Sequence, residues 1–462
     1  MNVVMLVVDS LRAKSLWEGG SAKTPFFDRL RRESVCFERA YATECWTLPS
    51  HMSMFTGLLP SQHRAHFQTM QYAASQPTAA ELLARAGYRT EVITRNSIFD
   101  GAVPGVTRGF HRNATILSPR RGLNPLSVML ALSKPRFRRQ ILSSGFFSAG
   151  QRMSREFVGR FARATVPADR EALAHLLARM EQLDRQRAPF FLFCNLYDVH
   201  VPYAPVERSI FRPLREPSTW SETLRMPFVL PKLGGHAYLR EGFQLSERSR
   251  QLLHARYHAA IELMDAKLGA FYEAAQSSGL LRDTLLIIAS DHGEAFGEHS
   301  LYLHDASVYD VHLRVPLFVR HPARAAERVS DVVSLRHLFG LIRAAASGST
   351  LHDTILDPEF RAAHPIAIAE HFHYPGVRNA RREFRGDLAA AIAGNQKVIV
   401  RRDGAFGYDL ARDEAERAPH PMGLEDFAAR CRAEGTTLST AAKALAHLQR
   451  FRGGTGAVGL AA

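Results

Sequence analysis

The sequence predicts an α/β fold in which helices flank a large, mostly parallel central sheet. Strand and helix signals alternate along most of the 462 residues, as in doubly wound sheets. Two almost wholly apolar runs, Val3–Val8 and Thr284–Ala289, have the composition of strands that are buried on both faces. An acidic residue follows each run, Asp9 in the first case and Asp291 in the second. The chemistry of an open α/β sheet lies at the carboxyl ends of its strands, so these residues indicate one site at one edge.

The elements of the first half follow from apolar spacing and from helix start and stop signals. Pro25 suits the first turn of a helix, and Gly57 ends a helical pattern that begins at Pro49. In order, we expect a strand over Val3–Val8, a short helix from Thr24-Pro25, a helix over Pro49–Thr56, a helix over Ala79–Ala86 and a strand over Thr90–Thr94.

The second half shows the same alternation. Apolar residues recur at near-helical spacing through one long segment that ends at Ser277. In order, we expect a helix over Ala168–Arg185, a strand over Phe190–Leu196, a helix over Ser246–Ser277, strands over Thr284–Ala289 and Val315–Val319, a helix over Leu335–Ala345 and a strand over Ile366–Ala369.

The length exceeds that of a single usual core, and we predict two units. Residues 1–380 form the catalytic domain, and residues 381–462 form a small α+β subdomain with a short antiparallel sheet, closed by helices after Leu424. Residues 104–166 lose the regular pattern and contain many Arg, Pro and Gly residues. We interpret them as a variable basic insertion, either a surface helix pair or an amphipathic segment that contacts a membrane surface.

Composition sets wide limits on the partners. The apolar fraction of 46% and the charged fraction of 23% are ordinary for a globular enzyme. A net charge of +14 is compatible with nucleic acid, an anionic membrane or acidic substrates. The basic residues are widely spread and no nucleic-acid-binding motif accompanies them. We therefore attribute the charge to a compositional bias and expect no nucleic-acid partner.

Cysteine usage and the first residues indicate a cytoplasmic protein. The four cysteines, Cys36, Cys45, Cys194 and Cys431, have neither CxxC nor metal-knuckle spacing. We expect reduced thiols. The first apolar run has no basic segment before it and ends at Asp9, unlike a signal peptide. No stretch approaches the ~18 apolar residues of a membrane span.

Asp9, Asp291 and His292 provide two carboxylates and one imidazole at the predicted edge. This ligand set suits one divalent cation, Mn²⁺, Mg²⁺, Ca²⁺ or Zn²⁺, and does not choose among them. A single acidic residue after a strand is more often a helix cap or a turn former. The adjacent Asp-His-Gly sequence, together with Asp9, favours a metal site.

A hydroxyl group at the predicted start of a helix offers a nucleophile. Thr47 lies two residues before Pro49, which suits a first helical turn. A helix N-terminus stabilises an alkoxide and offers N–H groups to an anionic substrate, and a bound cation lowers the pKa of the hydroxyl further. Thr47 is thus a candidate nucleophile and metal ligand. Locally, a plain N-cap is equally well supported.

Motifs in one order along the chain are Val7-Val8-Asp9-Ser10-Leu11-Arg12, Thr24-Pro25-Phe26-Phe27-Asp28, Thr47-Leu48-Pro49-Ser50-His51-Met52-Ser53-Met54-Phe55-Thr56-Gly57, Ser290-Asp291-His292-Gly293-Glu294, Gly297-Glu298-His299, Arg314-Val315-Pro316-Leu317, Lys397 and Tyr408-Asp409-Leu410. Together they resemble the sulfatase family of the alkaline phosphatase superfamily. The resemblance spans nearly the whole chain and is weakest over Pro104–Val166. It implies an alkaline-phosphatase-like fold, with Asp9, Asp291 and His292 as metal ligands and Thr47 in the nucleophile position.

The resemblance also implies roles for other residues. His200, in the segment Asp198-Val199-His200-Val201-Pro202-Tyr203, matches a substrate-binding histidine. His304 lies near a family Lys or His that contacts the transferred group or protonates the leaving group. We expect both to be catalytic. His51 stands where sulfatases carry an Arg that stabilises the nucleophile, and Asn96 follows a predicted strand at a position that faces the pocket. We expect both to bind substrate. Ser10 stands where many sulfatases have a second metal-binding Asp.

The largest departure from the family is at Thr47. Formylglycine sulfatases carry Cys or Ser there, in a Cys-x-Pro-x-Arg pattern, whereas this chain has Thr-Leu-Pro-Ser-His and Cys45 lies two residues too early. We therefore expect no formylglycine. Similar proteins with Thr here cleave or transfer phosphoesters.

We predict a metal-dependent hydrolase or transferase of a phosphate mono- or diester. The alternatives are a sulfatase that works without formylglycine and a non-catalytic binding protein. The expected partner is a small-molecule or a lipid- or glycan-linked anionic ester. Peripheral membrane contact through the basic insertion and the oligomeric state stay open.

Overall fold

The computed structural model describes both predicted parts of the chain. The described residues are 1–17, 22–101, 103–115, 169–201, 203, 233–304, 306–349, 351–374, 380–433 and 438–451. The predicted insertion over residues 104–166 therefore lies largely outside the described residues. Its first part is described, and Arg112–Thr115 forms a strand of the large sheet.

The central sheet has eight strands in the order β10-β2-β9-β6-β1-β5-β3-β4. Every described pairing is parallel except those of β9 with β2 and with β6, which confirms a mostly parallel sheet. The strands are β1 (Asn2–Val8), β2 (Val35–Tyr41), β3 (Arg89–Thr94), β4 (Arg112–Thr115), β5 (Phe190–Leu196), β6 (Thr284–Ala289), β9 (Arg314–Arg320) and β10 (Glu327–Ser334).

The register of the three middle strands forms the edge that carries the predicted site. Val7 lies opposite Asn195 of β5 and Ala289 of β6. All residues of β6, and those of β1 after Asn2, are buried. A strand with helices on both sides has no solvent face, which explains the nearly continuous apolar sequence. The residues that follow β1 and β6 therefore emerge side by side.

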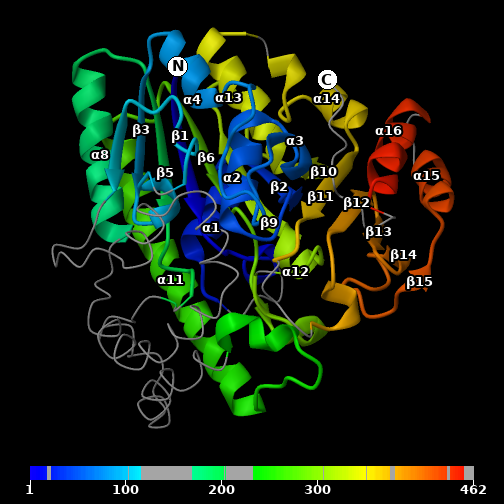
Figure 1. The fold of residues 1–462 in the computed structure, drawn as a ribbon. Coiled ribbons are helices and arrows are strands. Elements are labelled where there is room, and N and C mark those ends of the chain that lie inside the picture. The colour runs from blue at the N-terminus through cyan, green and yellow to red at the C-terminus, as the bar shows by residue number, and fades with distance from the viewer. Residues whose placement is uncertain are drawn as a thin grey trace.

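Helices cover both faces of this sheet, which runs between two helical layers in Figure 1. In one layer α11 packs against α8 and α1, and in the other α13 packs against α2 and α4. The helices are α1 (Pro25–Glu33), α2 (Thr47–Thr56), α4 (Ala79–Arg85), α8 (Asp169–Arg185), α11 (Glu247–Ser277) and α13 (Leu338–Ser347).

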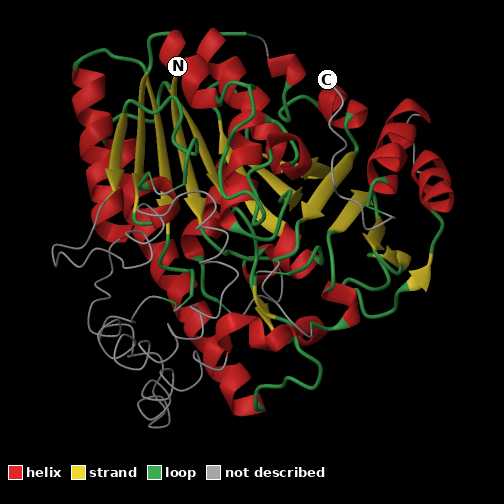
Figure 2. Cartoon of the chain, viewed as in Figure 1, coloured by secondary structure: helices red, strands yellow, loops and turns green. Residues whose placement is uncertain are grey.

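A second, five-stranded sheet stands beside the first, with two helices on its outer side (Figure 2). It is antiparallel throughout. Its elements are β11 (Ile366–His371), β12 (Leu388–Ala393), β13 (Gln396–Arg401), β14 (Gly404–Asp409), β15 (His420–Pro421), α15 (Leu424–Ala433) and α16 (Leu438–Gln449).

The two faces of the small sheet alternate between two cores. Ala390 and Ile392 of β12 belong to the main core, whereas Ala389 and Ala391 pack with residues of α15 and α16. The predicted antiparallel sheet is confirmed. Its first strand, β11, precedes residue 380, and the domain division at that residue stays a prediction.

The remaining short elements include α3 (Pro60–His63), α12 (Asp310–Leu313) and α14 (Pro358–Ala363). In the described part of the chain, no helix combines the length and the apolar character needed to cross a membrane.

Candidate metal centre and nucleophile

Three elements bring the predicted ligands together. Asp9 directly follows β1, Asp291 and His292 lie just beyond β6, and Thr47 is the first residue of α2. One ligand atom each from Asp9, Asp291 and His292 lies within 4.8 Å of the other two. All three side chains are fully buried. The convergence predicted from the strand ends is therefore present in the structure.

Hydrogen bonds fix the orientation of His292 and Asp291. The His292 Nδ1 lies 2.9 Å from the carbonyl oxygen of Gly293 and donates to it, which leaves the Nε2 lone pair facing the acidic residues. Asp291 Oδ1 accepts from the backbone N–H of Ser10 at 3.2 Å and of His292 at 3.0 Å. Among the described residues its Oδ2 is buried without a hydrogen-bond partner, 3.4 Å from His292 Nε2. Such an orphaned oxygen beside an imidazole nitrogen fits a cation ligand.

The pKa shifts within the cluster also favour a bound cation. Burial, reinforced by the negative charge of Asp9, holds the pKa of Asp291 well above its usual range. Burial tends to raise the pKa of Asp9 too, but the charges of nearby histidines, His200 first, lower it below its ordinary value. Burial also holds the pKa of His292 well below its usual range. Two carboxylates and a neutral imidazole that are excluded from water suit a divalent cation between them.

Thr47 faces this cluster from the N-terminus of α2. Its Oγ1 lies 3.4 Å from Asp9 Oδ2, to which it donates, and 3.4 Å from His292 Nε2. Trp46 is the extended N-cap residue and makes no side-chain cap, so Thr47 is not the plain N-cap. The same helix is tied to the metal edge because Ser50 Oγ donates to the carbonyl oxygen of Asp291 at 2.7 Å.

Ser10 holds an unusual backbone position beside the cluster. Its φ is +66°, in the left-handed region that costs free energy for a residue other than glycine. In this conformation its N–H reaches Asp291 Oδ1, and its Oγ donates to Asp9 Oδ1 at 3.0 Å. Where many sulfatases have a second acidic ligand, this chain thus places a hydroxyl that hydrogen-bonds to the first. The substitution is visible in the sequence, but no sequence pattern predicts this contact.

Gly293 is required by a close backbone approach. A Cβ on this residue would lie 2.1 Å from the carbonyl oxygen of Val311, and its N–H donates to the carbonyl oxygen of His312 at 2.7 Å. Any side chain here would therefore push the loop that carries Asp291 and His292 away from α12 (Asp310–Leu313).

The two predicted catalytic histidines form a row beside His292. The rings of His304 and His292 stack with centroids 4.3 Å apart, and His200 meets His304 edge-on at 4.9 Å. His304 Nδ1 lies 3.2 Å from Glu294 Oε1, so the last residue of the Asp-His-Gly-Glu sequence orients this ring. The sequence contained this signal, although no role was assigned to Glu294. His200 stacks on Tyr197 at 4.2 Å.

Asn96 and His51 lie against the cluster and make protein contacts. Asn96 Nδ2 donates to Asp9 Oδ2 at 3.2 Å, and its Oδ1 accepts from Ile98 N at 3.0 Å. The His51 Nδ1 donates to the carbonyl oxygen of Thr47 at 2.8 Å. Burial lowers the pKa of His51 to about 4, so this imidazole is neutral. The substrate-binding roles of both residues stay predictions.

His51 also borders an aromatic cluster. Its ring lies edge-on to Phe99 at 5.1 Å and to Phe193 at 5.5 Å. Its Nε2 is buried and has no hydrogen-bond partner within the part of the chain that the structure describes. A neutral ring in this setting positions the first turn of α2, whereas the arginine of formylglycine sulfatases would bring a permanent charge.

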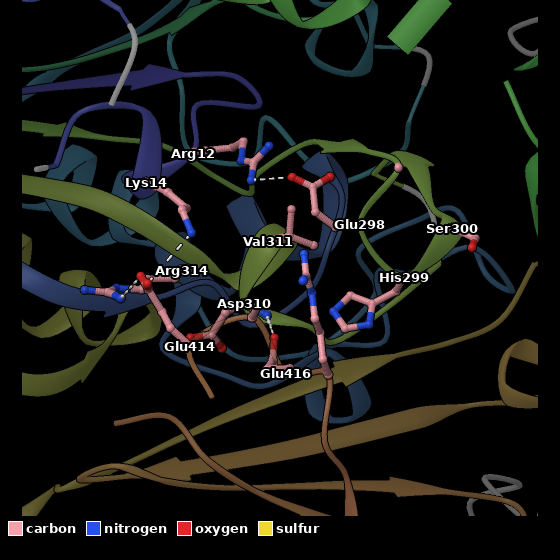
Figure 3. Close-up of a pocket in the computed structure, with 13 residues that line it drawn as sticks. Arg12, Lys14, Glu298, His299, Ser300, Asp310, Val311, Arg314, Glu414 and Glu416 are labelled. Carbon is pink, nitrogen blue, oxygen red and sulfur yellow. Dashed lines mark hydrogen bonds and ion pairs between the residues drawn. The ribbon is translucent and has the colours of Figure 1, made fainter. Parts of the chain in front are cut away.

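A cavity of about 440 Å³ lies near this edge and is lined by charged residues from distant parts of the chain (Figure 3). Arg12, three residues after Asp9, pairs there with Glu298 at 2.7 Å. The charged lining consists of four cations and four carboxylates, so it offers no excess positive charge to an anionic ester. They are Arg12, Lys14, Arg314, Arg417, Glu298, Asp310, Glu414 and Glu416.

Comparison with known proteins gives a consistent picture. A family model described as Sulfatase matches residues 1–349. The chain is 24% identical over 349 residues to iduronate 2-sulfatase of Mus musculus, a match that covers 71% of this chain and 60% of that protein. It is 26% identical over 380 residues to the multifunctional alkaline phosphatase superfamily protein PehA of Trinickia caryophylli, a match that covers 72% of each. The chain thus spans about 60% of the length of the mouse relative.

The fold also resembles that of a solved structure. Phosphonate monoester hydrolase of Agrobacterium radiobacter superimposes with a TM-score of 0.65 at 20% identity, covering 97% of this chain and 95% of that one. This identity is low enough that the likeness concerns the fold alone. The predicted alkaline-phosphatase-like fold is confirmed.

Proposed function

The chain belongs to the sulfatase family of hydrolases, and from this premise we propose that it cleaves or transfers a phosphate mono- or diester. Thr47 is the nucleophile, and one divalent cation is the cofactor. The observation that carries the proposal is the position of Thr47 Oγ1, 3.4 Å from both Asp9 Oδ2 and His292 Nε2. A hydroxyl in contact with two metal ligands at a helix start has the setting of an activated nucleophile.

The residues that would hold the cation are Asp9, Asp291, His292 and Thr47. Sulfatase-family members are metal-dependent, and the donor set of three oxygen-bearing side chains and one imidazole accepts Mn²⁺, Mg²⁺, Ca²⁺ or Zn²⁺. When bound, the cation supplies positive charge that lowers the pKa of the Thr47 hydroxyl and neutralises the non-bridging oxygens of the ester.

The protein residues then carry out two displacements. In the first, Thr47 Oγ1 attacks phosphorus in line with the bond to the leaving alcohol, while Asp9 Oδ2 accepts the hydroxyl proton. The P–O bond to the alcohol breaks, and His304 or His200 donates a proton to that oxygen. Glu294 orients the His304 ring through its Nδ1, and we assign the proton transfer to this ring or to that of His200.

In the second displacement, water or an acceptor alcohol attacks phosphorus and gives its proton to the histidine that protonated the leaving group. The P–O bond to Thr47 breaks, and Asp9 returns the proton to Thr47 Oγ1. The aldehyde-forming collapse available to formylglycine is absent, because threonine has no geminal diol. A phosphorus ester suits this second attack. The substrate class we propose is a small-molecule or a lipid- or glycan-linked anionic ester.

The test is a panel of phosphate monoesters, phosphodiesters, phosphonates and sulfate esters with each of the four cations. Wild type is compared with Thr47→Val, which keeps the shape and removes the hydroxyl, and with Thr47→Ser, which restores a hydroxyl. Loss of the nucleophile should lower turnover by roughly 10⁴-fold or more, and Thr47→Ser should recover a large part of it. Thr56→Val, at the other end of α2, is the matched control, because in the contacts described Thr56 Oγ1 bonds only to backbone groups: it donates to the Met52 carbonyl at 2.6 Å and accepts from the Leu58 N–H at 3.3 Å.

Each alternative predicts a different result. Preferential turnover of sulfate esters by wild type would replace the phosphate proposal with a sulfatase that lacks formylglycine. Full activity of Thr47→Val would remove Thr47 as the nucleophile. No turnover of any ester with any cation, from a protein that still binds metal, would favour the non-catalytic binding protein.

A further inference from the structure

A second group of metal-binding side chains lies in the segment that precedes Thr47. Glu44 and Cys45 are in the loop between β2 and α2, and His371 is the last residue of β11. Glu44 and Cys45 are fully buried, and His371 is 3% exposed. One ligand atom from each lies within 4.8 Å of the other two. Cys45 and His371 are 326 positions apart, so no cysteine spacing in the sequence could indicate the group.

The three side chains converge on one nitrogen atom. His371 Nδ1 lies 2.9 Å from Glu44 Oε1 and 3.5 Å from Cys45 Sγ. Glu44 Oε1 also accepts from the backbone N–H of Cys45 at 2.9 Å, which orients the carboxylate beside the thiol. Backbone pairing brings the two segments together next to this point, because Glu370 N donates to the carbonyl oxygen of Thr43 at 2.9 Å.

The donor set differs in chemical class from the first site. Thiolate, imidazole and carboxylate together are ligands of zinc, whereas sites built from oxygen donors suit Mg²⁺, Ca²⁺ and Mn²⁺. Tetrahedral zinc, with bonds of about 2.3 Å to sulfur and about 2.0–2.1 Å to nitrogen, separates those two atoms by about 3.5 Å. This equals the observed Cys45 Sγ to His371 Nδ1 distance of 3.5 Å. The carboxylate needs to move outward by about 0.4 Å to reach its tetrahedral separation from Nδ1.

The charge balance also suits a buried ion. One thiolate and one carboxylate neutralise a divalent cation, and a net neutral group avoids the large cost of isolated charge in a site shielded from water. We propose that Glu44, Cys45 and His371 form a zinc site distinct from the Asp9–Asp291–His292 cluster. Binding displaces the thiol proton of Cys45, which passes to solvent. It also replaces the hydrogen bond between His371 Nδ1 and Glu44, and the Nδ1 proton moves to Nε2, so the imidazole stays neutral. Water takes the fourth position.

The site would join the loop that carries the nucleophile to the small sheet. Cys45 lies two residues before Thr47, and His371 ends the first strand of that sheet. Zinc would therefore hold the loop before α2 against the small sheet. The inference does not depend on the ester that the enzyme cleaves.

Cobalt substitution separates the two sites. A thiolate ligand gives Co²⁺ an intense charge-transfer band in the near ultraviolet, and a site with only oxygen and nitrogen donors gives none. The chelator-treated full chain is titrated with Co²⁺, and total bound metal is measured in parallel. We expect a charge-transfer band that saturates at one equivalent and disappears when Zn²⁺ is added. Cys45→Ser and His371→Gln should each lose the band while the first site still binds cobalt.

The matched control is Cys36→Ser, because Cys36 is an equally buried thiol in β2 that belongs to neither metal-ligand group of the described residues. It should keep the band. Zinc should also protect Cys45 of the wild-type chain from alkylation, as measured by mass spectrometry, a readout that needs no variant to fold. No band in wild type, or a band that persists in Cys45→Ser, would overturn the proposal and leave Glu44 and His371 as a buried ion pair. Ester turnover enters neither readout, so failure here is distinguishable from failure of the Thr47 mechanism.

Discussion

Removal of the Lys397 ammonium should destabilise the protein in a pH-dependent way. Lys397 lies in β13, is fully buried, and places its Nζ 2.6 Å from both Asp310 Oδ1 and Glu416 Oε1. Burial alone would lower the pKa of Lys397, but the two carboxylates raise it above its ordinary value. One cation thus joins the small sheet to α12 and to the segment after β14. Asp310 and Glu416 also line the cavity drawn in Figure 3.

The magnitude follows from the loss of one partner of a buried ion pair. In Lys397→Met the apolar stem stays, and the buried Glu416 and the partly buried Asp310 lose their counter-charge, which costs about 3–5 kcal/mol. Burial raises the pKa of Glu416 to about 7 in the wild type, against the lowering effect of Lys397. In the variant this lowering effect is gone, so the pKa of Glu416 rises further.

The sign of the pH dependence follows from these values. An acid with a raised pKa in the folded state contributes stability at low pH that is lost as the pH rises through the folded pKa. Below pH 7 the wild type and the variant lose this contribution alike. Between pH 7 and pH 8 the variant alone continues to lose up to about 1.4 kcal/mol. The difference in unfolding free energy between the two proteins should therefore be larger at pH 8 than at pH 6.

Urea unfolding of both proteins at pH 6 and pH 8 measures this difference. Lys443→Met, on the exposed surface of α16, is the control and should change stability little. Adding Glu416→Gln to Lys397→Met should recover part of the loss and flatten its pH dependence. A loss below about 1 kcal/mol, or one that is equal at both pH values, would refute the reasoning, because a buried unpaired charge produces neither.

Two further predictions follow from the metal edge and from the helix beside it. Gly293→Ala should weaken metal binding, measured by calorimetric titration, and should lower stability by about 1–3 kcal/mol or more. The reason is that the added Cβ would lie 2.1 Å from the Val311 carbonyl oxygen. Unchanged metal affinity would contradict this prediction. Burial lowers the pKa of His63 from 6.5 to about 3, so the unfolded chain takes up a proton that the folded chain refuses, and stability falls as the pH drops below 6.5. His63→Gln should remove about 2 kcal/mol of the loss between pH 7 and pH 5, measured in urea, and identical pH profiles for the two proteins would count against it.

The central strands could be predicted from sequence because burial on both faces leaves an uninterrupted apolar run, as in β1 and β6. β2 and β10 were not predicted. β2 carries the partly exposed Glu38 and Arg39, and its pairing shifts register between Phe37 and Ala40. β10 is an edge strand of the large sheet, and its exposed polar residues come in two pairs, Glu327 with Arg328 and Ser330 with Asp331. Irregular and edge strands thus lose the signal that marks central ones.

The metal ligands could be predicted for a related reason. Asp9 and Asp291 each follow a recognisable strand, and parallel neighbours bring strand ends together. The contact of Ser10 with both carboxylates depends on a left-handed backbone conformation. Serine rarely adopts this conformation, so the residue type does not predict it. The Glu44–Cys45–His371 group requires pairing between the loop before α2 and the small sheet, which no local pattern encodes.

The place of β1 in the middle of the sheet has a consequence for the order in which the protein becomes functional. Ser10 and Asp291 are in contact although 281 positions separate them, and β1 pairs with β6 along almost its whole length. During synthesis, β1 is translated well before β6, so one of its two edges stays unpaired until β6 has been made. Until then the edge of β1 that faces β6 has no partner strand, and Asp9 is present without Asp291 and His292. The two parts of the Asp9–Asp291–His292 cluster therefore come together only once β6 has paired with β1.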